Sequence, residues 1–79
     1  MKIPRSISGV TLVKKLEKLG YTITRQSGSH IRLTTQLSGE HHITIPRHDP
    51  LKVEPLSSII NAVAEHFLTT KEGLVKDLF

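Results

Sequence analysis

Two segments of the chain repeat their apolar residues at the spacing of an α-helix. In the first, GVTLVKKLEKLG, Ser8 is placed to cap the start and Gly20 to end the helix in a left-handed conformation. In the second, Pro55 suits the first helical turn. Its apolar stripe comprises Leu56, Ile59, Ile60, Val63 and Phe67. A short third helix is predicted in KEGLVKDLF, capped by Thr69 or Thr70.

Between the two long helices, apolar and polar residues alternate with the period of a β-strand. Strict alternation puts Tyr21, Ile23 and Arg25 on one face of a first strand and Thr22, Thr24 and Gln26 on the other. A turn at Ser27 and Gly28 then leads into a second strand that buries Ile31 and Leu33. The opposite face of this second strand displays His30, Arg32 and Thr34.

A third strand, HHITIP, follows the turn LSGE. It is expected to bury Ile43 and Ile45, to expose His42 and Thr44, and to end at Pro46. The next segment, RHDPLKVEP, has two prolines and no clear period, which indicates a loop. The predicted fold is α+β with the order α-β-β-β-α and an extra C-terminal helix. Its three-stranded antiparallel sheet carries both long helices on one face.

The other face of this sheet would be polar, basic and rich in hydroxyl groups. Its residues are Thr22, Thr24, Gln26, His30, Arg32, Thr34, His42 and Thr44. Such groups can bond the phosphates and 2′-hydroxyls of RNA without reading its base sequence. The alternative is an ordinary solvated sheet face, and the pattern alone leaves both interpretations open.

Length and composition limit the organisation and the chemistry. A chain of 79 residues suits a single domain over 1–79, with a core over 8–67 and a C-terminal extension over 68–79. It has no apolar run of the roughly 18 residues that span a bilayer and no signal peptide at its start, so a cytoplasmic location is expected. The lack of cysteine excludes disulfides, thiol catalysis and cysteine zinc sites.

The net charge is +4, which fits a polyanionic partner such as nucleic acid but also fits ordinary solubility. Lys14, Lys15 and Lys18 fall mostly away from the apolar stripe of the first helix. They form either a phosphate-binding surface or a solvated helix face.

His30 is the candidate for acid–base chemistry, because an imidazole can accept or donate a proton at neutral pH. Gly28 and Ser29 remove bulk beside it, and Arg32 on the same face can stabilise negative charge. RNA cleavage through the adjacent 2′-hydroxyl requires a base, an acid and positive charge near the phosphorus, with no obligatory metal.

The other histidines could serve as metal ligands or as partners of a carboxylate. His41 and His42 are adjacent on a strand and point to opposite faces, so no metal site and no cofactor are expected. His48 and Asp49 could orient each other or a backbone turn, or supply a histidine–carboxylate pair. The sequence contains no Gly-rich phosphate loop of the required spacing, no GxSxG and no HExxH.

Two stretches of the chain, LVKKLEKLGYTITRQSGSHIRLT and HHITIPRHDPLKVEPLSSII, are similar to the small HicA-type toxins of bacterial toxin–antitoxin pairs. The similarity covers roughly residues 8–64. Its anchors are the Leu-Gly-Tyr that ends the first helix, the triplet from Gly28 to His30, the run from Ile45 to His48, and Leu56 through Ile60.

The resemblance implies a fold like that of a double-stranded RNA-binding domain, an endoribonuclease activity on mRNA, and a hetero-oligomer with a neutralising HicB-type antitoxin. It makes His30 the catalytic residue, with Gly28 and Ser29 giving the RNA backbone access to it. Arg47 and His48 match a family motif and are supporting candidates without an assigned role.

Two alternatives to an endoribonuclease toxin are a noncatalytic RNA-binding module and a protein-binding adaptor with a basic face. The segment EHFLTTKEGLVKDLF, which contains the C-terminal extension, continues beyond the end of the shortest members of the family. It is expected to add core, a dimer contact or an antitoxin contact.

Overall fold

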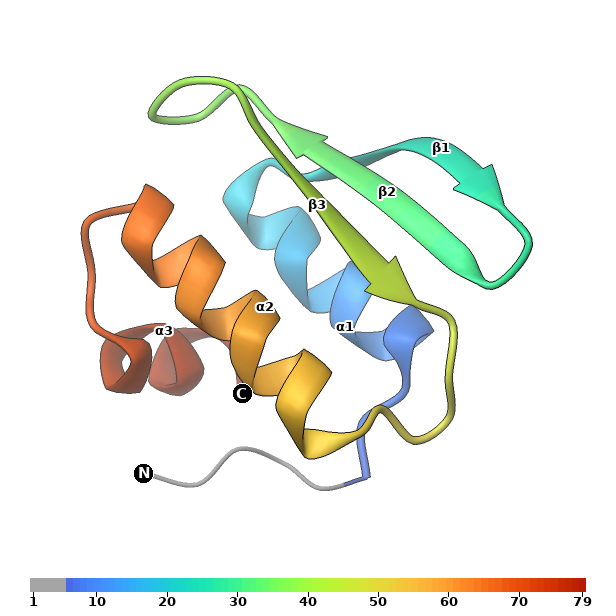
Figure 1. Ribbon diagram of the computed structural model, residues 1–79. Coiled ribbons are helices and arrows are strands. Elements are labelled where there is room, and N and C mark those ends of the chain that lie inside the picture. Colours follow the sequence, from blue (N-terminus) through green and yellow to red (C-terminus); the bar gives the residue numbers. More distant parts are fainter. Residues whose placement is uncertain (1–5) are drawn as a thin grey trace.

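A computed structural model describes residues 6–79 as a three-stranded antiparallel sheet with helices on one face (Figure 1). The elements in chain order are α1 (Gly9–Leu16), the 3₁₀ turn η1 (Glu17–Leu19), β1 (Thr22–Ser27), β2 (His30–Thr35), β3 (His41–Pro46), α2 (Val53–His66) and α3 (Lys71–Leu78). Figure 1 shows α1 and α2 beneath the sheet and α3 beside α2. The predicted α+β class, element order and C-terminal helix are confirmed.

The helix ends follow the capping residues that the sequence contains. The Ser8 side chain accepts a hydrogen bond from the Thr11 backbone N–H, and the Thr70 side chain accepts one from the Gly73 N–H. Gly20 ends the first helical segment with φ +82°, the left-handed conformation that glycine adopts without steric cost. Both predicted N-caps, Ser8 and Thr70, are confirmed.

The predicted loop over 47–55 is too long at its C-terminal end, because α2 already begins at Val53. Pro55 occupies the first turn of this helix, as predicted. A proline is tolerated there because the first backbone N–H groups of a helix have no partner within the helix.

The core lies between the sheet and the helices. Ile31 and Leu33 from β2 and Ile43 and Ile45 from β3 are buried, as predicted. They pack with the apolar stripes of the helices, whose buried members are Leu12, Val13, Leu16, Leu56, Ile59, Ile60, Val63, Ala64, Leu74, Val75 and Leu78. The C-terminal extension therefore adds core, which is one of the three roles expected for it.

Strand β1 departs from the predicted alternation. Ile23 pairs with Leu33, but the next pair is Arg25 with Arg32, so Thr24 is an extra residue in a β-bulge. The bulge moves Arg25 to the outer face of the sheet, the face turned away from the helices, and moves Gln26 opposite Ile31. The predicted faces of Arg25 and Gln26 are therefore wrong.

Thr34 also differs from the expectation of an exposed position. It lies on the outer face but is buried, because its hydroxyl hydrogen-bonds to both Thr24 and His42 from the neighbouring strands. The outer face of the sheet thus has an ordered polar layer of its own.

Candidate functional site

The outer face of the sheet arranges polar side chains in three cross-strand rows. The row at the hairpin end contains Ser27, His30 and Pro46; the middle row contains Arg25, Arg32 and Thr44; the third row contains Thr22, Thr34 and His42. Residues directly opposite in an antiparallel pair have Cβ atoms about 4.5–5.5 Å apart, so each row is one contiguous strip of surface.

His30 is the first residue of β2 and pairs with Ser27 across a two-residue turn formed by Gly28 and Ser29. Gly28 has φ +56°, and no atom lies within 4 Å of the place that a Cβ would occupy. The turn therefore uses glycine for its backbone conformation and leaves open space beside the histidine.

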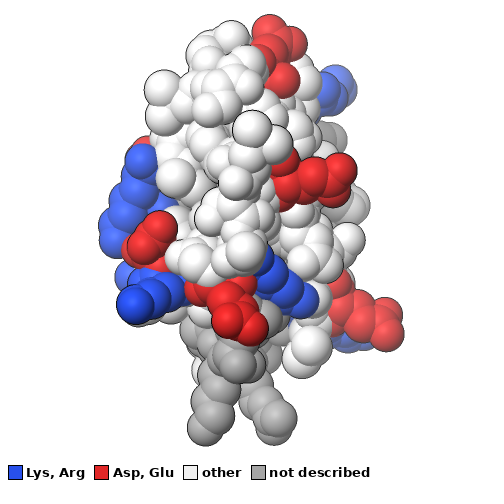
Figure 2. All heavy atoms as spheres, turned by 90° about the vertical axis from the view of Figure 1, so that its left-hand side faces the viewer, with Lys and Arg blue, Asp and Glu red and all other residues white. Residues whose placement is uncertain are grey.

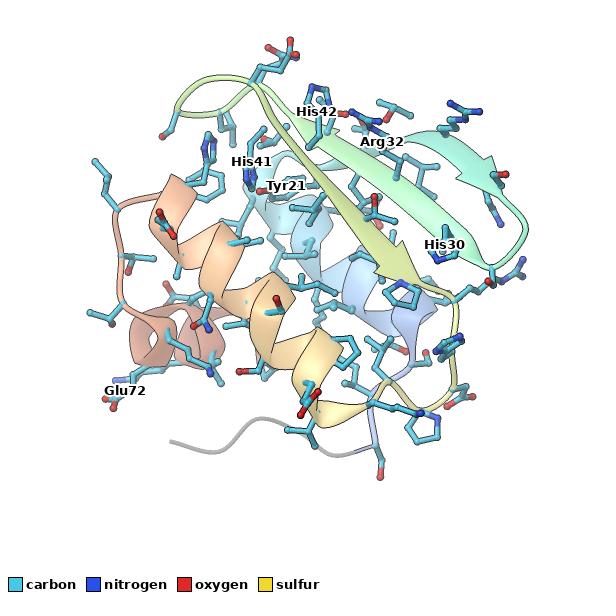
Figure 3. The ribbon with its side chains drawn as sticks, viewed as in Figure 1. Tyr21, His30, Arg32, His41, His42 and Glu72 are labelled. Carbon is cyan, nitrogen blue, oxygen red and sulfur yellow. The ribbon has the colours of Figure 1, made fainter. Side chains whose placement is uncertain are left out.

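The imidazole of His30 is exposed on this face (Figure 3). The hydrogen bonds that histidine rings form within residues 6–79 involve His41, His42 and His66, and His30 takes part in none of them. Arg32, two residues farther along β2, is exposed as well. Two residues of a strand span about 6.6 Å, so both side chains can contact one extended ligand.

The backbone after β3 is tied to this hairpin. The Arg47 N–H donates to the Ser29 carbonyl oxygen at 2.6 Å, and the Gly9 N–H donates to the His48 carbonyl oxygen at 2.8 Å. A Cβ on Gly9 would lie 2.1 Å from the Pro46 carbonyl oxygen, so only glycine permits this approach of α1. Arg47 and His48 are thereby placed beside the triplet that contains His30.

The structure does not bring every predicted site residue together. Lys14, Lys15 and Lys18 lie in α1 and η1, whose apolar side chains pack against the inner face of the sheet. They are therefore in the layer opposite to His30, and their assignment to RNA binding stays a prediction. His48 and Asp49 form no ion pair; the ion pair found within residues 6–79 joins His42 and Glu40.

A chain of hydrogen bonds fixes the third row. Glu40 Oε2 accepts from His42 Nε2 at 2.7 Å, His42 Nδ1 lies 2.7 Å from Thr34 Oγ1, and Thr34 Oγ1 lies 3.1 Å from Thr24 Oγ1. The hydrogen bond from His42 lowers the pKa of the Glu40 carboxyl below its ordinary value. This series of hydrogen bonds ends at Thr24, the inserted residue of the bulge, and so helps to fix the bulge in place.

A second histidine cluster, which the sequence did not predict, lies on the inner side of the sheet (Figure 3). The rings of His41 from β3 and His66 from α2 stack with centroids 4.3 Å apart. His41 Nδ1 lies 2.7 Å from the hydroxyl of buried Tyr21, and His66 Nε2 donates to the Leu37 carbonyl oxygen at 2.9 Å. Burial raises the pKa of Tyr21 to about 12.

This cluster is expected to make the protein less stable in mild acid. Burial lowers the pKa of His41 below its ordinary value of 6.5, and the nearby His66 and His42 lower it further. The unfolded chain therefore binds more protons than the folded chain in mild acid, so the free energy of unfolding decreases as the pH falls from about 7.5 to about 5.5. Urea unfolding at several pH values measures this change.

The variant His41→Gln should show a shallower pH dependence of the unfolding free energy than the wild type. His48→Gln is the matched control, because it removes an exposed histidine whose ring makes no hydrogen bond within residues 6–79. A wild-type protein that is equally stable at both pH values would contradict the role given to His41.

His41 and His42 point to opposite sides of β3, as the strand period predicts (Figure 3). Within residues 6–79 no group of three or more His, Asp or Glu side chains is arranged to hold a metal ion. Among the same residues, no helix is both long and apolar enough to cross a membrane.

Charge is distributed differently on the helical side. Figure 2 shows the side of the molecule that carries α3 and the end of α2, where acidic and basic side chains are interspersed. Arg25 and Arg32, in contrast, lie directly opposite each other in the middle row of the outer face. Two exposed positive charges of the sheet therefore lie together in the row beside His30.

Comparison with known proteins identifies the family of this chain. Searches of curated proteins and of solved structures give no match. A family model described as "HicA toxin of bacterial toxin-antitoxin" matches residues 9–64, which is more than half of the chain. The match includes the hairpin that carries His30 and the segment from Pro46 to His48. The chain therefore belongs to the HicA toxin family of bacterial toxin–antitoxin systems.

Proposed function

We propose that this toxin is an endoribonuclease that cleaves mRNA with His30 as a general acid or base and without a metal or other cofactor. The observation that carries the proposal is an exposed imidazole with no hydrogen-bond partner among residues 6–79, displayed on a basic sheet face beside the turn of Gly28 and Ser29. Membership of a toxin family supports it, because RNA is a target whose destruction arrests growth.

The proposed reaction needs only groups that the outer face can supply. A base removes the proton of a ribose 2′-hydroxyl, the 2′ oxygen attacks the adjacent phosphorus, and the bond from phosphorus to the 5′ oxygen breaks. An acid returns a proton to that 5′ oxygen, which leaves a 2′,3′-cyclic phosphate and a 5′-hydroxyl. His30 performs one of the two proton transfers, and Arg32 stabilises the charge that develops on the phosphate oxygens.

The other candidate site residues around His30 have supporting roles in this proposal. Gly28 and Ser29 let the RNA backbone approach His30, and Arg47 supports this region through its backbone bond to Ser29. His48, on the adjacent loop, is a candidate for the second proton-transfer group. A HicB-type antitoxin would neutralise the toxin as a hetero-oligomer in the cytoplasm.

Cleavage of defined oligonucleotides tests this function. The purified protein is incubated in the presence of EDTA with mixed-sequence RNA and with the same sequence as DNA. We expect RNA to be cut to products with 2′,3′-cyclic phosphate ends and DNA to stay intact, because DNA lacks the attacking hydroxyl. RNA that is bound but not cut would instead favour a noncatalytic RNA-binding module.

A further inference from the structure

The β-bulge in β1 creates a charge arrangement that regular strand pairing would not produce. If the register between Ile23 and Leu33 continued, Thr24 would pair with Arg32, and Arg25 would pair with Ile31 on the inner face. The extra residue instead places Arg25 opposite Arg32 on the outer face. One inserted residue thus assembles an arginine pair in the row next to His30.

This pair is unfavourable for the fold taken alone. Like charges directly opposite each other in a sheet repel, and both arginines are exposed members of one cross-strand pair. In the part of the chain that the structure describes, neither guanidinium has a carboxylate within 4.0 Å, since the ion pair there is between His42 and Glu40. The repulsion is therefore not neutralised within residues 6–79.

The bulge is also held in place by defined contacts. Thr24 Oγ1 donates to the Arg32 carbonyl oxygen at 3.4 Å and contacts Thr34 Oγ1 at 3.1 Å. Thr34 is in turn fixed by His42, whose other ring nitrogen is bound to Glu40. The same chain that supports the bulge occupies the Glu40 carboxylate, so this acid pairs with His42 and not with an arginine.

We infer that Arg25 and Arg32 together bind one phosphodiester group of the RNA substrate, with Arg25 as a substrate-binding residue that the sequence pattern had placed on the wrong face. Two guanidinium groups offer planar donor pairs that match phosphate oxygens. The exposed hydroxyl of Thr44 completes the row. The inference rests on the proposed function for the identity of the polyanion, and on the register for the site itself.

Binding of a single-stranded RNA oligonucleotide tests this inference in a His30→Ala background, in which the RNA is not expected to be cut during the titration. Adding Arg25→Gln should weaken binding about tenfold. It should also reduce the slope of log affinity against log salt by up to about 0.7, the value for complete loss of one phosphate contact on a single strand, because Arg32 still contacts the shared phosphate. The RNA affinity of the Arg25→Lys protein should lie between that of the protein with Arg25 and that of the Arg25→Gln protein, because lysine keeps the charge but loses the paired donors.

Lys76→Gln in the same background is the matched control, because it removes the same charge from an exposed position on α3, away from the outer face. Equal affinity and equal salt slope for the Arg25→Gln and Lys76→Gln proteins would overturn the inference. Thermal unfolding gives an independent readout: Arg25→Gln should raise the melting temperature by relieving repulsion, and a decrease would show a structural partner for Arg25 and also count against the site.

The two proposals can fail separately. If the protein with native His30 cuts RNA but Arg25→Gln binds like the control, the nuclease stands and the arginine site is wrong. If no RNA is cut but Arg25→Gln weakens binding with the expected salt slope, the site stands and the enzymatic function is wrong.

Discussion

Replacing His30 by alanine is expected to reduce RNA cleavage by about 10²–10⁴-fold, the usual contribution of a positioned acid or base. The imidazole is exposed and makes no hydrogen bond within residues 6–79, so the free energy of unfolding should change by no more than about 0.5 kcal/mol. Single-turnover cleavage of an RNA oligonucleotide measures the first quantity, and urea unfolding of the same preparations measures the second.

The His30→Ala protein should still bind RNA, because Arg25 and Arg32 are unchanged. His48→Ala is the informative companion variant, since a comparable loss of cleavage there would identify the second proton-transfer group. In bacteria, induced wild type should arrest growth with loss of mRNA, whereas induced His30→Ala should do neither. Equal cleavage by wild type and His30→Ala would remove His30 from the chemistry.

Ending the chain after Thr69, which removes α3, is expected to leave the protein largely unfolded. The deletion takes away Leu74, Val75 and Leu78, each at most 6% exposed. Burial of such side chains contributes about 1.5–3 kcal/mol each, or about 5–9 kcal/mol together. A domain of this size has only about 5–15 kcal/mol of stability in total, so the loss is of the same order as the whole.

Circular dichroism and urea unfolding of the shortened chain measure this effect. Removing Phe79 alone is the control, because its side chain is 38% exposed and lies outside the buried cluster. That variant should unfold cooperatively near the wild-type midpoint. A shortened chain that keeps a cooperative transition close to that of the wild type would show that α3 is dispensable, even though Lys71 also donates to Ser57 of α2.

The truncation concerns a part of the molecule that lies outside the family match. The matched region ends at residue 64, before the last residues of α2 and all of α3. In this chain the core nevertheless continues to Leu78. The C-terminal extension is therefore part of the folded unit, and a loss of toxicity after its removal would first indicate unfolding.

The helices could be predicted from the sequence because two independent signals agree. The apolar stripe of α1 begins one turn after Ser8 and stops before Gly20, and α3 begins directly after Thr70. The sequence does not define the start of α2 in the same way, because Pro55 is compatible both with a loop and with a first helical turn. Only the packed structure decides between them.

The bulge could not be predicted because the sequence of β1 alternates regularly across it. Thr22, Thr24 and Gln26 read as one face, and no glycine marks the inserted residue. Its position depends on Thr34 and His42, which lie on other strands. The same reason hides the stacking of His41 on His66, since these residues are 25 positions apart and share no motif.

Only the part of the candidate site that lies in one short stretch of sequence could be predicted. The triplet ending at His30 identified the exposed histidine through its small neighbours and its family pattern. The contribution of Arg25 depends on strand register, and the approach of Arg47 depends on a backbone bond to Ser29. The placement of Arg25 and the approach of Arg47 both arise from tertiary structure, so no residue spacing in the sequence predicts them.

The bulge in β1 has a further consequence for the behaviour of the protein at high concentration. β1 is an edge strand with all six residues exposed, and the exposed edges of sheets can pair with a second molecule and begin aggregation. An irregular strand that carries a charged residue at its bend is a poor template for such pairing. The inserted Thr24 is therefore expected to disfavour pairing of β1, one of the two edge strands of this sheet, with a second molecule.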